Sequence, residues 1–254
     1  PMAKADPVAV NAGVVHEVLG LARAAGACDV FPVGAITRGL EGEAMAELGE
    51  MFDAGVRVFS DDGRCVPNAR VLRNALTYVS AFEAAVIAEH CEDASLAEGG
   101  QMHEGSVSAS LGLAGQPREA EEVVVARDLA VAKLTAGRLH LCHLSSAGSV
   151  EMVRRAKAEG LRVTAEVTPH HLVFGEEDLV TYDTNMKMNP PLRSDGDRSA
   201  LRAALADGTI DVVATDHAPH AVEEKEAEFD QAPFGTIGLE TALGVNVSWL
   251  LEPG

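Results

Sequence analysis

The strongest constraint on the fold is an alternation of short apolar segments with longer amphipathic ones. Six segments rich in Val and Ala have the character of strands, and they lie at residues 28–33, 56–60, 85–88, 139–144, 162–167 and 210–214. Helical periodicity is found at residues 11–25, 43–54, 68–82, 119–136, 150–159, 197–206 and 239–250. The strand segments do not alternate polar with apolar residues, which is typical of a parallel sheet buried on both faces. The pattern predicts an α/β fold, either a doubly wound sheet or a (β/α)8 barrel.

The dinucleotide-binding form of the doubly wound sheet has no support, because no Gly-x-Gly-x-x-Gly segment follows a first strand. One long interruption, residues 92–118, is rich in glycine. We interpret it as a functional loop rather than a linker, since long loops inside compact domains usually serve function.

Composition excludes several classes of protein. Acidic residues outnumber basic ones 39 to 20, for a net charge of −19, which argues against a nucleic-acid partner. No apolar run approaches the ~20 residues that span a bilayer, so no membrane segment is expected. The four cysteines form no Cys-x-x-Cys pair and no small-scaffold spacing, so we expect free thiols in a reducing compartment. Together these features predict a soluble cytoplasmic protein.

Polar side chains of the kind that bind metals follow several predicted strands. The carboxyl ends of barrel strands converge on one mouth, so residues far apart in sequence would share a site there. Imidazole and carboxylate groups suit zinc and similar divalent ions. The candidate positions are Asp61, Asp62, Glu89, His90, His143, His170, His171, Asp216, His217 and His220.

Each of these residues alone has an ordinary explanation. We interpret Asp61 as a turn former, whose loss should matter far less than that of Asp216. His170 and His171 are read as capping residues, and His16, His103 and His140 as surface or loop residues. A serine nucleophile is not indicated, because no Gly-x-Ser-x-Gly segment is present. The combination of acids and histidines after separate strands is what predicts a metal site.

Several motifs, in order along nearly the whole chain, resemble the longer bacterial type of the dihydroorotase family, within the amidohydrolase superfamily. They are FSDDG at 59–63, HCE at 90–92, LCHLS at 141–145, VTAEVTPHHL at 163–172, KMNPPLR at 187–193 and ATDHAPH at 214–220. The resemblance implies a (β/α)8 TIM barrel holding one or two zinc ions. It also implies an enzyme that interconverts N-carbamoyl-L-aspartate and L-dihydroorotate in pyrimidine biosynthesis.

The resemblance also implies roles for individual residues. Asp62 would be the metal-bridging carboxylate, and His90 and His143 would bind the second metal. Asp216 would bind the first metal and carry the proton. The residues expected to contact substrate are Asn189, His220, Phe234 and Gly235.

Two departures from the family pattern shape the expectations. The His-x-His-x-Arg segment of the family's first strand is absent. Residues 1–254 therefore resemble an internal fragment of about six of eight strand–helix units, without the first two strands and the C-terminal region. Expressed alone, they are expected to be inactive. Lys4 also stands where the family has an asparagine that helps to bind substrate.

Two alternatives stay open at this point. Some relatives are inactive barrels that serve as scaffolds for aspartate transcarbamoylase, although such barrels lose metal ligands that this sequence keeps. Another cyclic amidohydrolase, such as an allantoinase or hydantoinase, is disfavoured by Asp62, because many of these enzymes place a carboxylated lysine on that strand. A homodimer or a complex with aspartate transcarbamoylase is compatible with the resemblance.

Overall fold

The computed structural model describes residues 2–4 and 7–251 and contains one parallel six-stranded sheet. Its strand order is β1-β2-β3-β6-β7-β8, which follows the chain except for the short β4–β5 pair that forms its own sheet. The strands are β1 (Val33–Gly34), β2 (Val58–Phe59), β3 (Val86–Glu89), β4 (Met102–His103), β5 (Gly115–Gln116), β6 (Leu139–Leu141), β7 (Val163–Val167) and β8 (Val212–Val213). This sequential parallel order, with helices between the strands, is that of an incomplete (β/α)8 barrel, as the sequence predicts.

Seven of the α-helices in the described residues lie close to the predicted segments, and four short ones have no predicted counterpart. The helices are α1 (Ala12–Ala25), α2 (Leu48–Asp53), α3 (Ala69–Val79), α4 (Ala94–Ala97), α5 (Ser106–Leu111), α6 (Glu119–Thr135), α7 (Ala147–Ala158), α8 (Pro169–Val173), α9 (Asp195–Ala206), α10 (Val222–Lys225) and α11 (Ala242–Asn246). Local chemistry sets their ends: the Asn11 side chain accepts hydrogen bonds from the N–H groups of Gly13 and Val14 at the start of α1. Gly26 ends the same helix in the left-handed conformation.

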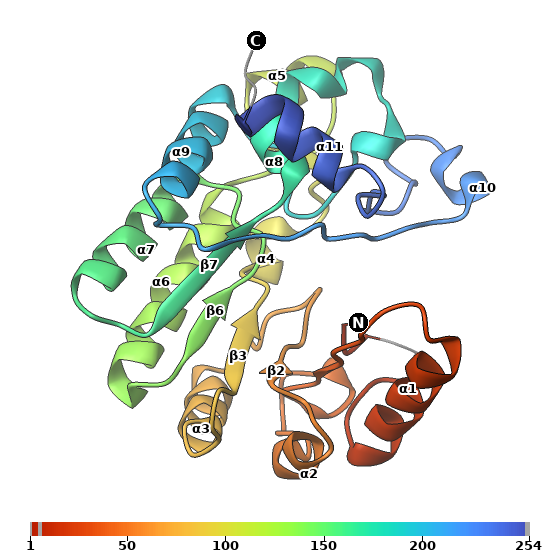
Figure 1. The fold of residues 1–254 in the computed structure, drawn as a ribbon. Helices are drawn as coiled ribbons and strands as arrows, with labels where there is room; N and C mark the ends of the chain where they lie inside the picture. Colours follow the sequence, from red (N-terminus) through yellow and green to blue (C-terminus); the bar gives the residue numbers. More distant parts are fainter. Residues whose placement is uncertain (1, 5–6, 252–254) are drawn as a thin grey trace. The chain divides into compact units, whose positions relative to one another are not determined.

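The chain folds as two compact units that are interleaved in sequence. The first comprises residues 1–91, 125–142 and 155–164, and the second comprises 92–124, 143–154 and 165–254. In the first unit β1, β2, β3 and β6 pair in parallel, with Phe59 opposite Ile87 and Glu89 opposite Leu141. Helix α3 packs beside β3 through a face that buries Leu72, Ala75 and Leu76 (Figure 1).

The second unit contains the end of β7 paired with β8, with Val167 opposite Val213. One apolar cluster packs α8 and α9 onto these strands through Val167, Leu172, Leu201 and Ile210. A second cluster is built around buried Met102, Leu179, Met188, Leu192 and Phe229.

Three predictions of local structure need correction. Residues 92–118, predicted as a loop, contain α4, α5 and the β4–β5 pair. The first strand lies at Val33–Gly34 rather than at 28–33, where Cys28 and Phe31 are exposed. The last helix is divided into α11 and a π-helical turn at Val247–Leu251.

Two predictions made from composition can be compared with the structure. No helix in the described residues is long and apolar enough to cross a membrane. All four cysteines are free thiols, and Cys91 and Cys142 are buried.

Candidate active site

Asp62 and His90 lie together in the first unit, each just beyond the end of its strand. Asp62 follows β2 and His90 follows β3, and the two strands are parallel neighbours. The imidazole Nδ1 of His90 is 3.5 Å from Oδ1 of Asp62, and both side chains are about 5% exposed. The other carboxylate oxygen, Oδ2, accepts a hydrogen bond from Nζ of Lys4 at 3.2 Å. The structure therefore brings together two of the predicted metal ligands.

His143 follows β6, the next strand in the sheet. In the first unit, the backbone N–H of Cys142 donates to the carbonyl oxygen of Glu89 at 3.0 Å, which continues the β3–β6 ladder to the residue before His143. His143 itself begins a segment of the second unit, is buried, and has a positive φ of 34°.

The chemistry of these three side chains fits a metal ion. Asp62, His90 and His143 offer one carboxylate and two imidazoles, all three from buried residues. This donor set is typical of zinc in proteins. Burial of these side chains favours metal binding, because it limits the access of competing water.

Asp61 is not the simple turn former that the sequence suggests. It is 2% exposed, and its carboxylate accepts hydrogen bonds from Ile36 N at 2.8 Å, from Thr37 N at 3.0 Å and from the Thr37 hydroxyl. Burial raises the pKa of Asp61, while these hydrogen bonds lower it in part. Asp61 therefore ties the segment after β1 to the end of β2, next to Asp62.

We expect Asp61→Ala to destabilise the fold by about 3 kcal/mol, because buried donors left unsatisfied cost ~1–3 kcal/mol each. Urea denaturation gives the free energy of unfolding directly. Asp53→Ala is the matched control, since Asp53 is exposed at the end of α2. Equal free energies of unfolding for the two variants would contradict the role assigned to Asp61.

Asp216 lies in the second unit, three residues beyond β8, in a half-buried loop. Its φ of 43° is in the left-handed region, which is unusual for a residue with a side chain. The next residue, His217, fixes the loop: its Nδ1 accepts from the N–H groups of Gly238 at 3.1 Å and Leu239 at 3.3 Å. Asp216 thus lies just after a strand end, the position that the sequence predicts for it.

The predicted substrate contacts form two groups in the second unit. Asn189 donates from Nδ2 to Glu92 Oε2 at 2.7 Å and accepts from Gln116 Nε2 at 3.3 Å. His220 Nε2 donates to the carbonyl oxygen of Phe234 at 2.8 Å. Gly235 has a φ of 139°, and a Cβ there would lie 2.6 Å from Ala218 O, so a side chain does not fit at this position.

Sequence reasoning missed a buried network around Arg193. Its guanidinium donates to Gln116 O at 2.8 Å, to Ser145 Oγ at 3.1 Å and to His103 Nδ1 at 3.2 Å. His103, predicted to be a surface or loop residue, is 3% exposed. Burial, and then the charge of Arg193, lower the pKa of His103 to about 4. The only sequence feature that could have indicated this network is Arg193 itself, the last residue of the KMNPPLR motif.

His171 is likewise structural. Its ring bonds Thr168 Oγ1 at 2.7 Å and Pro190 O at 2.9 Å, and burial lowers its pKa to about 3. The capping role predicted for His170 and His171 is wrong. Both residues lie inside α8, whose N-cap is Thr168, and the Thr168 hydroxyl accepts a hydrogen bond from the His171 N–H.

These two histidines predict an acid-sensitive fold. An unfolded histidine titrates near pH 6.5, so below that pH the unfolded chain binds protons that folded His103 and His171 do not. We expect the free energy of unfolding to fall as the pH drops from 7.5 to 5.5, measured by urea denaturation. His171→Asn should reduce this pH dependence and His16→Asn, at an exposed site, should not. The same free energy of unfolding at both pH values would contradict the prediction.

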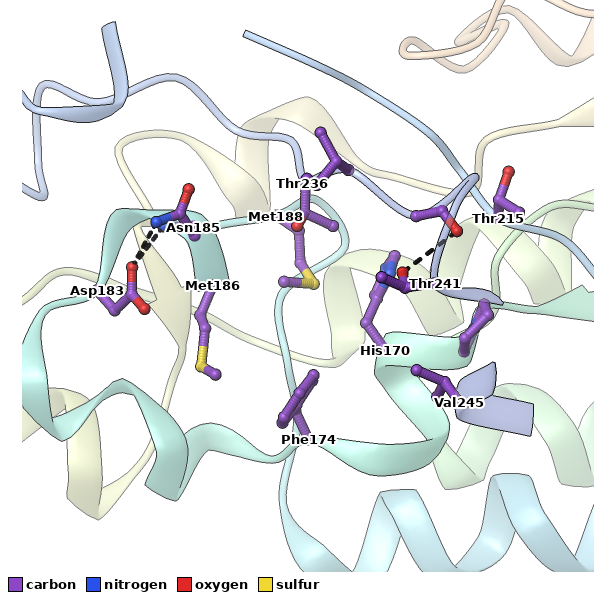
Figure 2. Close-up of a pocket in the computed structure, with 13 residues that line it drawn as sticks. His170, Phe174, Asp183, Asn185, Met186, Met188, Thr215, Thr236, Thr241 and Val245 are labelled. Carbon is purple, nitrogen blue, oxygen red and sulfur yellow. Dashed lines mark hydrogen bonds between the residues drawn. The ribbon is translucent and has the colours of Figure 1, made fainter. Parts of the chain in front are cut away.

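A separate cavity of about 210 Å³ lies in the second unit (Figure 2). It is lined mainly by apolar groups. His170 is among its walls, but none of the residues expected to bind metal or substrate lines it. Its walls are Pro169, His170, Phe174, Asp183, Asn185, Met186, Met188, Thr215, Thr236, Ile237, Gly238, Thr241 and Val245. An apolar cavity is poorly suited to an anionic substrate.

Comparison with known proteins gives a consistent result. The family model described as "Dihydro-orotase-like" matches residues 13–149. The dihydroorotase of Leifsonia xyli subsp. xyli is 56% identical over 255 residues, covering 100% of this chain and 58% of its own length. The dihydroorotase of Streptomyces coelicolor is 55% identical over 255 residues, covering 100% and 59%. The chain therefore spans somewhat under three fifths of the length of these relatives.

Solved structures agree on the fold. The L-hydantoinase (dihydropyrimidinase) from Arthrobacter aurescens superimposes with a TM-score of 0.81 at 26% identity, covering 97% of this chain and 56% of that one. A dihydroorotase from Saccharomyces cerevisiae, crystallised with 5-fluoroorotic acid, gives a TM-score of 0.71 at 16% identity and covers 97% and 68%.

The parallel sheet and these structural neighbours place the chain among the TIM-barrel amidohydrolases. Within that class, the match to the family model over more than half of its residues shows that the chain belongs to the dihydroorotase-like family.

Proposed function

We propose that the protein is a zinc-dependent dihydroorotase, which interconverts L-dihydroorotate and N-carbamoyl-L-aspartate in pyrimidine biosynthesis. The observation that carries the proposal is the buried Asp62–His90 pair at the ends of neighbouring parallel strands. The 56% identity to a curated dihydroorotase along the whole chain supports it. Residues 1–254 would supply about six of the eight strand–helix units of the barrel.

In this proposal Asp62, His90 and His143 hold a zinc ion, and Asp216 contributes to a second metal position. Zinc in such a site polarises a carbonyl oxygen and lowers the pKa of water. Asp216 then acts as the general base and acid. Its carboxylate takes a proton from the water that attacks the ring carbonyl, and it returns that proton to the ring nitrogen as the C–N bond breaks.

Asn189, His220 and the Phe234–Gly235 backbone orient the substrate. The Asn189 amide is held in one orientation, because Glu92 accepts from its nitrogen and Gln116 donates to its oxygen. This arrangement leaves the second N–H of the amide for a substrate oxygen. Gly235 allows the backbone to approach closely, as its crowding by Ala218 indicates.

Glu92→Ala tests this orientation. Without the acceptor, the Asn189 amide can rotate, and we expect KM for dihydroorotate to rise about tenfold with a smaller change in kcat, as for a lost binding contact. Glu98→Ala is the control, because Glu98 is exposed on the same segment. Identical KM values for the two variants would argue against a role for Glu92 at Asn189.

The substrate is tested by comparing ring hydrolysis of L-dihydroorotate, hydantoin and allantoin by the protein expressed from its complete gene. The proposal predicts that kcat/KM is highest for dihydroorotate. Faster hydrolysis of hydantoin would favour a hydantoinase, the activity named for the A. aurescens structure. No turnover of any of the three by folded, zinc-loaded protein would favour an inactive scaffold.

The assembly and location are further proposals. The acidic composition and the free thiols support a cytoplasmic protein. A homodimer, or a complex with aspartate transcarbamoylase, would appear as a larger species in light scattering of the protein alone or after mixing.

A further inference from the structure

The ammonium group of Lys4 lies against the carboxylate of Asp62. Nζ of Lys4 is 3.2 Å from Oδ2 of Asp62, within the first unit. The Asp62 side chain is 5% exposed, whereas that of Lys4 is 52% exposed, so the lysine reaches from the surface to a buried acid. This contact differs from an ordinary surface ion pair, because the Asp62 carboxylate is desolvated by burial.

The backbone beside Lys4 is anchored, which keeps the ammonium within reach of Asp62. Ala3 is fully buried and packs with Ala9 and Ala35. The N–H of Ala9 donates to Ala3 O at 3.0 Å, and the N–H of Ala35 donates to Ala9 O at 2.8 Å, so this segment is tied to the chain just after β1. Lys4 is therefore positioned by the fold.

The two oxygens of Asp62 face different partners. Oδ1 is 3.5 Å from Nδ1 of His90, the other proposed metal ligand in the unit. Oδ2 carries the hydrogen bond from Lys4. A metal ion that binds both oxygens of Asp62 must therefore displace the Lys4 ammonium. A metal ion that binds Oδ1 alone would lie close to the positive charge of Lys4.

We propose that Lys4 is a built-in cation that competes with the metal for Asp62 and weakens metal binding at this site. The inference rests on the proposed metal site and concerns a residue that is not a ligand. Its physical basis is Coulombic: two positive charges that share one buried carboxylate repel each other. In this account, Lys4 sets the metal affinity of the site.

The test is the zinc dissociation constant, measured by competition with a chromophoric chelator on the protein expressed from its complete gene. Lys4→Met keeps the length of the side chain and removes its charge. Lys133→Met is the matched control, because Lys133 forms an exposed ion pair with Glu159 in the same unit. Asp62→Asn reports whether the zinc is bound at Asp62 at all, and circular dichroism confirms that each variant is folded.

We expect Lys4→Met to bind zinc at least about tenfold more tightly than the unmodified protein at low salt, and Lys133→Met to be unchanged. The difference should shrink in 1 M salt, because the half-exposed ammonium is screened there, whereas a purely structural effect would persist. Equal affinities for Lys4→Met and the unmodified protein, with Asp62→Asn impaired, would overturn the role of Lys4 alone. Zinc affinities that are the same in all variants, including Asp62→Asn, would overturn the metal site and the inference together.

Discussion

Asp216→Ala is expected to reduce dihydroorotate turnover at least about a hundredfold in the protein expressed from its complete gene. A positioned acid–base group contributes ~10²–10⁴ in rate, and the loss of a metal ligand would add to that. The fold should survive, because Asp216 lies in a half-buried loop after β8 rather than in an apolar cluster. Steady-state kinetics, with circular dichroism for folding, measure the effect.

The control for this variant is Asp195→Ala, whose side chain is 76% exposed in the first turn of α9. Its turnover should stay close to that of the unmodified protein. Asp61→Ala does not serve as the control, since Asp61 is buried and holds the segment at Ile36 and Thr37. A folded Asp216→Ala variant with near-normal turnover would rule out the proposed proton transfer.

Asp62→Asn is expected to weaken zinc binding at least about a hundredfold and to abolish turnover. Loss of an outer partner of a metal ligand costs about 10–100-fold in metal affinity or activity, so loss of an anionic ligand should cost at least as much. The amide preserves the shape of the side chain and can still contact Lys4 or His90 through its oxygen. Competition with a chelator gives the dissociation constant.

Asp53→Asn provides the comparison for Asp62→Asn, because it makes the same change at an exposed position in the same unit. It should leave zinc binding and turnover unchanged. If Asp62→Asn binds zinc as tightly as Asp53→Asn does, the metal lies elsewhere.

The sequence was most informative where local chemistry decides the structure. Helix α1 begins directly after its cap, Asn11, and α2 ends at Asp53, just before Gly55, whose φ is 113°. Six parallel strands were predicted from Val- and Ala-rich runs. Five lie at or within one residue of the predicted segments, whereas β1 shares only Val33 with the segment predicted for it. In each case, a few residues that are neighbours in the sequence are enough to predict the helix end or the strand.

The misses come from interactions between distant residues. Strands β4 and β5 are too short for a periodic pattern, and they form only because Met102 pairs with Gly115 and His103 with Gln116. His103 is buried by contact with Arg193, 90 positions away. Asp61 resembles a turn residue in sequence, yet its partners are 24 and 25 positions earlier.

The candidate site likewise has features that the sequence predicts and features that only the folded structure shows. Strand-end positions led to Asp62 and His90, and the structure brings these two together. The contact of Asp62 with Lys4 and the hydrogen bonds of Glu92 and Gln116 with Asn189 depend on tertiary packing, and no motif in the sequence indicates them.

The most direct test of the proposed function is the zinc dependence of dihydroorotate hydrolysis, followed as the formation of N-carbamoyl-L-aspartate. Protein expressed from its complete gene is stripped with a chelator and then titrated with zinc. The account predicts that turnover disappears in the stripped protein, returns in proportion to bound zinc, and does not return in Asp62→Asn. Full turnover by the metal-free protein, or none by folded protein that has bound zinc, would contradict it.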